Sequence, residues 1–389
     1  MGKALVIGGS SGLGLSITVE LLKKGKYVYI VGRNPPDIGL VSSSIRDRFV
    51  EATSFMELDL NSEDYHVFDE IRDIDTLVIT AGFGRVALLE NLTEVEIRNL
   101  IRCNELSPIQ IIRKYYDFIK SKVDFKCAVI VSIAGLVVSP YLSAYGAAKA
   151  GLASFIASVN VELAASKCNN RILNCSPGAL IGTAFNGGIN DISKLNTLSS
   201  EIIERMDNKD TLFIPNYEAV YKDVIRDYRD NPEQFGLKSY KYKETSNRVN
   251  TKPQVVIGYL SGTFDLFHIG HLNLLRRAKS KCDYLIVGVH ESGAWKGKET
   301  FIPFEERKQI IGSVRFVDKV VTSFTEDTDA WTEYQYDKLF VGSDYKGSER
   351  FRKYELFFKD RGVEIIYFPY TKGTSSTQLR ETLSSISSQ

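Results

Sequence analysis

Short apolar runs, rich in β-branched residues, alternate with longer segments of helical periodicity along the first 230 residues. Strands are predicted at Ala4–Ile7, Tyr27–Val31, Asp75–Thr80, Ala128–Ser132 and Arg171–Cys175. Strands that alternate with helices imply right-handed crossovers and a parallel sheet covered on both faces. The pattern therefore predicts an α/β domain with a doubly wound parallel sheet over residues 1–230.

A second alternation follows a polar interruption. Residues 231–253 are rich in Lys and Tyr and lack the strand pattern, so we interpret them as a linker. Further strands are predicted at Val255–Ile257, Tyr284–Val289, Phe316–Val321, Lys338–Val341 and Val363–Tyr367. The sequence thus predicts a second α/β domain over residues 254–389.

Composition narrows the class of protein. With 49 basic and 48 acidic residues among 389, the net charge of +1 gives no electrostatic footprint for nucleic acid or an anionic membrane. No apolar stretch reaches the roughly 20 residues of a membrane span. The five cysteines include no CxxC pair, so neither a disulfide framework nor a cysteine zinc site is indicated. We expect a soluble, cytoplasmic protein that acts on small molecules, without nucleic-acid or membrane partners.

A glycine-rich turn follows the first predicted strand. Gly8, Gly12 and Gly14, with Ser10 and Ser11 between them, precede a Leu-rich helical segment. Glycines let the backbone turn tightly and let a pyrophosphate approach the N–H groups of a helix N-terminus. Alone this is a weak signal, because plain strand-to-helix turns are also glycine-rich. With support downstream it predicts a Rossmann-type dinucleotide site.

That support comes from three residues at fixed spacing. Tyr145 and Lys149 lie four apart, and residues so spaced share a helix face, so the lysine can lie beside the phenol and lower its pKa. Ser132 precedes Tyr145 by thirteen positions. A phenol tuned in this way is a general acid for a carbonyl. At these residues the sequence resembles the short-chain dehydrogenase/reductase family, over about residues 1–230.

The resemblance implies a role for each of these positions. Tyr145 would donate the proton to the carbonyl oxygen, Ser132 would hydrogen-bond that oxygen, and Asn104 would hold Lys149 through water. The family's contacts with the cofactor correspond to Asp59, Ala81, Gly82, Pro177 and Gly178. Ile7 replaces the usual Thr and Ile79-Thr80 the usual Asn-Asn, which affects turn hydrogen bonds but no chemical role. The family also implies a homo-oligomer that pairs through the helices around Asn91–Ser121 and Ala144–Ser166.

Cofactor choice depends on the end of the second predicted strand. An NAD enzyme carries an acidic residue there, roughly 20 residues after the glycines, to bind the ribose hydroxyls. Here the sequence is Gly32-Arg33-Asn34, with a guanidinium that can bind a 2′-phosphate and no carboxylate to repel it. We therefore expect NADPH. The alternative is that Arg33 is an ordinary solvent-facing loop residue.

A second chemical motif follows the strand at Val255–Tyr259. It runs Gly262-Thr263-Phe264-Asp265-Leu266-Phe267-His268-Ile269-Gly270-His271 and holds two of the chain's four histidines. Such a pair at a helix N-terminus can hydrogen-bond phosphate oxygens while backbone N–H groups add positive potential. Zinc is the competing interpretation, but zinc needs three or four ligands and no third partner is clear. We expect no protein-bound metal.

The motif resembles the cytidylyltransferase family that includes glycerol-3-phosphate cytidylyltransferase, over about residues 254–385. The resemblance implies catalytic roles for His268, His271 and Lys298, and Mg²⁺ that accompanies CTP. Contacts with CTP or the acceptor are implied at Gly262, Thr263, Phe264, Asp265, Lys296, Arg307, Arg315, Gly342, Asp344, Ser375, Ser376 and Thr377. Tyr370 stands where the family has Arg, and Thr374 where it has Ile. An adenylyltransferase related only through His-x-Gly-His remains an alternative.

Together the two resemblances imply consecutive steps. A phosphorylated ketose would be reduced to an alditol phosphate and activated as a CDP-alditol, a donor for teichoic-acid-like or capsular polymers. Ribulose 5-phosphate and CDP-ribitol are the first choice, with glycerol or mannitol as alternatives. No Walker-type loop is present, so the ketose must already carry its phosphate, with Arg85, Lys194 or Arg205 as candidate contacts. The other hypothesis makes the first half a non-catalytic NADP sensor that regulates the cytidylyltransferase.

Overall fold

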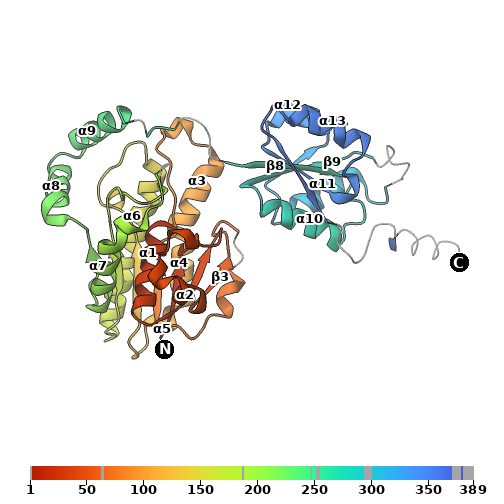
Figure 1. Cartoon of the computed structure of the whole chain (residues 1–389). Helices are drawn as coiled ribbons and strands as arrows, with labels where there is room; N and C mark the ends of the chain where they lie inside the picture. The colour runs from red at the N-terminus through yellow and green to blue at the C-terminus, as the bar shows by residue number, and fades with distance from the viewer. Residues whose placement is uncertain are drawn as a thin grey trace. The chain divides into compact units, whose positions relative to one another are not determined.

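The computed structural model describes residues 2–62, 65–185, 188–246, 248–250, 255–292, 300–369 and 378–379. The chain divides into two compact units, Met1–Pro253 and Gln254–Gln389, each built on one parallel sheet (Figure 1). The predicted fold class, two α/β domains with Rossmann-type sheets, is confirmed. Among the described residues, no helix is both long and apolar enough to cross a membrane.

The sheet of the first unit has seven parallel strands in the order β3-β2-β1-β4-β5-β6-β7. They are β1 (Lys3–Ile7), β2 (Tyr27–Gly32), β3 (Thr53–Glu57), β4 (Thr76–Ile79), β5 (Lys126–Ile130), β6 (Ile172–Cys175) and β7 (Leu212–Phe213). Two of them, β3 and β7, fall outside the apolar runs. The reason is that β3 is only partly buried and β7 has just two residues.

Helices cover both faces of this sheet, and side chains that alternate along each strand feed the two cores. Ala4 and Val6 of β1 pack in one core with the helices α1 (Gly12–Lys23), α2 (Ser43–Glu51) and α7 (Asn196–Asp207). Leu5 and Ile7 pack in the other core. Its helices are α4 (Ser107–Lys114), α5 (Tyr116–Ile119) and α6 (Ser143–Ala165), with α3 (Glu94–Ile101) packed beside α6.

The segment interpreted as a linker is mostly helical, which corrects that interpretation. Helix α8 (Lys222–Asp230) is followed directly by α9 (Pro232–Glu244). The Tyr240 and Tyr141 rings lie 4.8 Å apart, so α9 packs against the loop that precedes α6. Farther along, the backbone N–H of Asn250 donates to the Val86 carbonyl at 2.8 Å. The described residues 232–250 therefore belong to the first unit.

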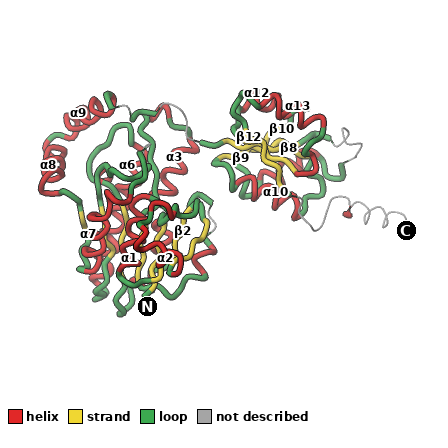
Figure 2. The backbone as a smooth tube through the Cα atoms, in the orientation of Figure 1, coloured by secondary structure: helices red, strands yellow, loops and turns green. Residues whose placement is uncertain are grey.

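The second unit has five parallel strands in the order β10-β9-β8-β11-β12. They are β8 (Ile257–Gly262), β9 (Tyr284–Val289), β10 (Lys319–Thr322), β11 (Lys338–Gly342) and β12 (Glu364–Phe368). One face packs on α10 (Ile269–Lys279) and α11 (Phe304–Gly312). The other packs on α12 (Asp327–Tyr334) and α13 (Glu349–Phe358), so this sheet also lies between two layers of helices (Figure 2).

Both sheets change winding direction beside their first strand. In the first unit β1 pairs with β2 on one side and β4 on the other, and in the second β8 pairs with β9 and β11. Ligands of open α/β sheets bind outside the carboxyl ends of the strands at such a switch point. The loops after β1 and β4, and those after β8 and β11, are therefore where the sites belong.

Candidate active sites

The turn after β1 is shaped to receive a ligand against its backbone. Gly8 has φ +84°, and Gly12 has φ +49°, in the left-handed region that glycine tolerates best. A Cβ on Gly14 would collide with the Gly8 carbonyl oxygen, so only glycine fits there. Ser10 Oγ is buried and has no hydrogen-bond partner in the described part of the chain. The turn thus offers an unused hydroxyl beside the N-terminus of α1, which begins after its N-cap Ser11.

Thr80 compensates for the unusual residues of this turn. Its Oγ1 donates to the Ile7 carbonyl at 2.9 Å, and the Thr80 and Ala81 N–H groups donate to the same oxygen. The loop after β4 is therefore tied to the end of β1 without the family's usual side chains. This brings Ala81 and Gly82 next to the glycine turn, as the resemblance implies.

Arg33 lies exposed at the end of β2. Gly32 before it has no room for a side chain, because its Cβ would lie 2.6 Å from Ser10 Oγ. The Asp59 carboxylate accepts a hydrogen bond from the Asn61 N–H at 2.9 Å and so caps its own turn. Arg33 thus places a guanidinium at the carboxyl end of β2, and Asp59 is the carboxylate that follows the neighbouring strand β3.

The predicted catalytic residues come together beside the loop after β4, and they are Asn104, Ser132, Tyr145 and Lys149. The Ser132 side chain lies close enough to the Tyr145 phenol to act on its pKa, and Lys149 Nζ lies 5.8 Å from the centre of the tyrosine ring. Asn104 is in a π-helical turn, Arg102–Leu106, a feature that is frequent at functional sites. Asn104 Oδ1 and Lys149 Nζ approach the same point beside Gly82, at 2.6 and 3.4 Å from the position of a Cβ there.

The pKa of Tyr145 departs from the expected direction. Burial raises it to about 12, and only the Ser132 hydrogen bond acts to lower it. Burial also lowers the pKa of Lys149 to about 8, and its Nζ donates to the Ile130 carbonyl at 3.0 Å. Burial therefore sets the direction of the phenol's pKa in this structure, and no lowering by Lys149 offsets it. Tyr145 is protonated at neutral pH, as a proton donor must be.

Two aromatic residues that the sequence did not indicate border this site. The Phe185 ring lies 5.4 Å from the Tyr145 ring. The Tyr221 hydroxyl occupies the space that a Cβ on Gly178 would need, so the Pro177-Gly178 turn is closed from that side. Neither residue belongs to a local motif, and both reach the site from loops or helices that follow β6. No sequence signal could have identified them.

The three cations expected to bind a substrate phosphate are all paired with carboxylates. Arg85 is 4% exposed, pairs with Glu96 at 2.6 Å and also donates to the carbonyls of Asn91 and Asn250. Lys194 pairs with Asp191 at 3.5 Å and Arg205 with Asp210 at 3.0 Å. Arg85 is thus held within the fold by Glu96 and two carbonyls through Nε and Nη1, while its buried Nη2 has no hydrogen-bond partner among the described residues.

In the second unit the histidine pair begins helix α10. His268 is its N-cap, and its Nδ1 accepts a hydrogen bond from the Gly270 N–H at 3.0 Å. The His268 and His271 rings stack with centroids 4.0 Å apart, and Phe264 and Phe267 contact His271 from either side. Burial lowers the pKa of His268. Because Nδ1 accepts, a neutral His268 carries its proton on Nε2, which can donate to a ligand.

The loop before this helix is strained and held by buried charges. Phe264 and Leu266 have φ of 53° and 50°, unusual values for bulky residues. The Asp265 carboxylate accepts hydrogen bonds from the Phe301 and Ile302 N–H groups. Arg307 is fully buried and donates to the carbonyls of Thr263, His290, Glu291 and Ile302. Both side chains therefore hold the loop in this structure, and the ligand roles implied for Asp265 and Arg307 stay predictions.

The remaining implied contacts divide into two groups. Arg315 is exposed, with its guanidinium 4.9 Å from the Phe316 ring centre, and Asp344 is exposed beside Gly342 at the end of β11. Outside the described residues lie Lys296, Lys298, Tyr370, Thr374, Ser375, Ser376 and Thr377. Within the described part of the chain, no group of three His, Cys, Asp or Glu residues could hold a metal ion.

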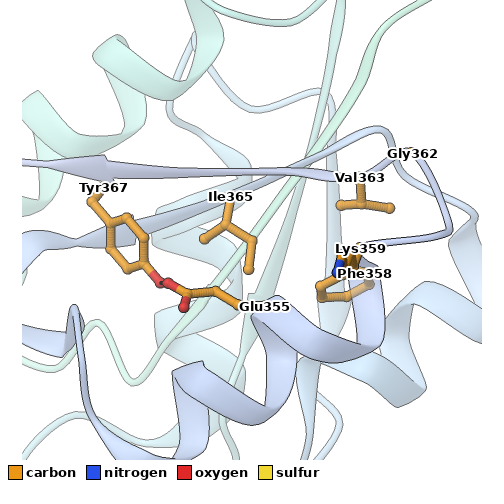
Figure 3. A pocket seen from close by; sticks show the side chains of 7 residues that line it. All are labelled: Glu355, Phe358, Lys359, Gly362, Val363, Ile365 and Tyr367. Atoms are coloured by element: carbon orange, nitrogen blue, oxygen red, sulfur yellow. Dashed lines mark hydrogen bonds between the residues drawn. The ribbon is translucent and has the colours of Figure 1, made fainter.

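A cavity of about 250 Å³ opens between α13 and the edge strand β12 (Figure 3). Its lining includes Glu355 and Tyr367, whose hydroxyl donates to Glu355 Oε1 at 2.7 Å. None of the lining residues belongs to the loops after β8 or β11. We assign this cavity no part in the site.

Comparisons with known proteins match a different family to each unit. Residues 2–193 match the family described as short chain dehydrogenase, and residues 259–382 match the family described as cytidylyltransferase-like. Two nucleotide-binding classes of fold are therefore joined in one polypeptide. The chain belongs to the cytidylyltransferase-like proteins through its second unit, and its first unit carries the match to the short chain dehydrogenases.

Individual relatives cover one unit each. The chain is 34% identical over 129 residues to glycerol-3-phosphate cytidylyltransferase of Bacillus subtilis (strain 168). The matched stretch makes up 32% of this chain and 95% of that protein. It is 28% identical over 197 residues to a 3-oxoacyl-acyl-carrier-protein reductase of Chlamydia trachomatis, 48% of this chain and 77% of that protein. A short chain dehydrogenase of Burkholderia cenocepacia J2315, solved in complex with NADP, superposes with a TM-score of 0.50 and 19% sequence identity. The superposition covers 61% of this chain and 96% of that one. At that identity the likeness shows the fold alone.

Proposed function

We propose that the chain is a bifunctional enzyme that reduces a phosphorylated ketose with NADPH and then transfers CMP from CTP to the alditol phosphate formed. The best candidate is ribulose 5-phosphate, with CDP-ribitol and pyrophosphate as products for a surface polymer. The observation that carries the proposal is the cluster of Ser132, Tyr145 and Lys149 beside a glycine turn, in the same chain as the histidine pair of the second unit.

The residues around the first turn fit NADPH. Gly8 and Gly14 leave room for the pyrophosphate, the buried Ser10 hydroxyl has a donor to offer, and Arg33 can meet a 2′-phosphate. The related dehydrogenase solved in complex with NADP has the same fold, which supports this cofactor. When bound, NADPH supplies the hydride for the carbonyl carbon.

The protein's own residues supply the proton and orient the carbonyl. Tyr145 is protonated at neutral pH and donates its proton to the carbonyl oxygen, while Ser132 donates a hydrogen bond to the same oxygen. Lys149 lies buried beside the same ring, with its Nζ 5.8 Å from the ring centre. Asn104 Oδ1 is buried without a partner in the described part of the chain, so it is available to a water that bridges to Lys149.

In the second unit the histidines act on the α-phosphate of CTP. An oxygen of the alditol phosphate forms a bond to the α-phosphorus, and the bond from the α-phosphorus to the pyrophosphate breaks. His268 Nε2 and His271 donate to the phosphate oxygens on which charge develops, at the positive end of α10. Mg²⁺ would enter with the nucleotide and offset the negative charge of its phosphates.

One incubation tests this function. The full chain is mixed with NADPH, CTP, Mg²⁺ and a panel of ketose phosphates, and the products are followed by mass. We expect one ketose phosphate to give a CDP-alditol with stoichiometric oxidation of NADPH. Binding of NADPH without its oxidation by any ketose phosphate would instead support a sensor, and pyrophosphate release from ATP but not CTP would support an adenylyltransferase.

A further inference from the structure

The proposed ketose phosphate brings a dianion to the first unit, and a group on this unit must meet it. The cations that the sequence indicated are already neutralised by Glu96, Asp191 and Asp210. Lys149 is buried beside the phenol and serves the carbonyl end of the substrate. A phosphate contact must therefore come from a cation whose charge is not already matched.

Lys243, on helix α9, is such a cation. Its Nζ donates to the Ser139 hydroxyl at 2.6 Å and to the Pro140 carbonyl at 2.8 Å, both neutral acceptors. Among the described residues no carboxylate forms an ion pair with it. An ammonium has three N–H donors, so one remains for a ligand after these two bonds. Lys243 thus has both an unmatched charge and an unused donor.

The position of Lys243 relates it to the catalytic residues. Ser139 and Pro140 belong to the short loop between Ser132 and α6, the helix that carries Tyr145. Within this loop the Leu142 N–H donates to the Ser139 carbonyl, so the chain turns back just before α6 begins. In Figure 1, α9 lies at the end of the first unit away from the N-terminus, which is the side where the parallel strands have their carboxyl ends. The ammonium therefore faces the loop that borders the reductase site.

The burial of Lys243 has an energetic consequence. Desolvation lowers its pKa to about 8, which shows that the two neutral acceptors do not fully replace the water lost by the ammonium. An anion at this point would restore the charged form and gain a charge-assisted hydrogen bond. Helix α9 is held against the loop before α6 by the contact of Tyr240 with Tyr141, which keeps the lysine in place.

We propose that Lys243 binds the phosphate group of the ketose phosphate in the reductase unit and so selects phosphorylated over free ketoses. This inference rests on the proposed function, since it assumes that a ketose phosphate is the substrate. It assigns a binding role to a helix that lies beyond the part of the chain matched by the dehydrogenase family, residues 2–193.

The test compares kcat/KM for a ketose phosphate and for the matching free ketose in the full chain. We expect the wild type to prefer the phosphate at least tenfold, as one charge-assisted contact can supply, and Lys243→Gln to lose most of that preference through KM. The rate with the free ketose and the CMP transfer should stay unchanged. Lys241→Gln is the matched control, because Lys241 is an exposed lysine on the same helix. An unchanged preference in Lys243→Gln would overturn the proposal.

A pH series covers the case in which Lys243→Gln does not fold. The preference for the phosphate should fall between about pH 7 and pH 9.5 in the wild type, because Lys243 loses its proton near 8 while the phosphate stays dianionic. Taking the ratio of the two substrates removes the contribution of Lys149. Other titratable groups where the loop meets the helix are Tyr141, Tyr240 and Glu244, and the contact with Tyr240 together with burial raises the pKa of Tyr141 to about 12, above this range.

Lys243→Arg should hold that preference constant with pH, because a guanidinium stays charged. A preference that is equally independent of pH in wild type and Lys243→Arg would reject the role of Lys243. The proposed function fails separately, if the wild type reduces no ketose phosphate while it still binds NADPH. That outcome would reject both proposals, whereas reduction with an equal preference in all variants rejects only this one.

Discussion

The loops after β1 and β8 occupy the same place in two similar sheets, yet their backbones are built in different ways. The first loop is built from Gly8, Gly12 and Gly14, so a ligand can approach the backbone itself. The second loop puts Phe264 and Leu266 into a backbone conformation that bulky residues avoid. Its function is to aim side chains, because the strained turn leads directly into the histidine pair. A shared topology therefore fixes where a ligand binds and leaves open whether backbone or side chains bind it.

The two loops also differ in how they are held. In the first unit a neutral side chain, Thr80, ties the loop after β4 to Ile7, the last residue of β1 before the glycine turn. The second needs two buried charged groups, the Asp265 carboxylate and the Arg307 guanidinium, each bonded to backbone groups. Strain in the second loop has to be offset by such contacts, since αL conformations of non-glycine residues cost of order 1–3 kcal/mol each. The comparison predicts that variants of the two units fail in different ways.

Tyr145→Phe should give the largest effect and should separate the two units. Without the phenolic proton, reduction is expected to fall by ~10²–10⁴ while CMP transfer persists, since no residue of the second unit changes. NADPH oxidation and pyrophosphate release are measured on the same sample. Retained NADPH binding is the control for folding. Equal loss of both activities would contradict independent sites.

His271→Ala should produce the reverse pattern. Removal of one donor to the developing charge is expected to lower kcat of CMP transfer by ~10²–10³ and to leave reduction intact. Pyrophosphate release with saturating CTP measures the change. Full CMP transfer by this variant would remove the histidine pair from the mechanism and leave the strained loop without a purpose.

Arg307→Met and Arg315→Met separate two arginines for which the resemblance implies the same role. Met at 307 leaves four backbone carbonyls without their donor, so the second unit should lose roughly 3–5 kcal/mol of stability. Arg315 is exposed, and its replacement should change stability by less than about 0.5 kcal/mol while it raises KM for CTP. Denaturant unfolding of the full chain, followed in parallel with CTP kinetics, checks both. A folded Arg307→Met variant with only a raised KM would support its implied role as a ligand.

Much of the fold and of the first site could be predicted because local sequence encodes it. Buried parallel strands are continuous apolar runs, and Tyr145 and Lys149 share a face of one uninterrupted helix. The spacing of His268 and His271 likewise places both at one helix N-terminus. Their chemistry could be argued from residue types alone.

What could not be predicted depends on contacts between distant positions. The Arg307 guanidinium donates to the Thr263 carbonyl, 44 positions earlier in the sequence. Tyr221 closes the turn at Gly178, from which it is separated by 43 positions. No periodicity records such pairs. Helix α9 is a different case, since a signal was present: Asn231 followed by Pro232 is an N-cap with proline at the first helical position, and the Asn231 side chain accepts from the Gln234 N–H.

Gly236→Ala tests that helix and carries the smallest expected effect. Glycine within a helix costs roughly 0.5–1 kcal/mol relative to alanine, mainly through backbone entropy. A Cβ at Gly236 would lie 3.5 Å from Val138 Cγ2, which is ordinary van der Waals contact, so nothing has to move. The variant should therefore stabilise the first unit and raise its Tm by roughly 1–4 °C, while the second unit unfolds as before. An unstructured linker would instead give no change in Tm, and a lowered Tm would mean that α9 does not pack on Val138 as described. Either result would also remove the support on which Lys243 depends, because the same helix holds that ammonium against Ser139.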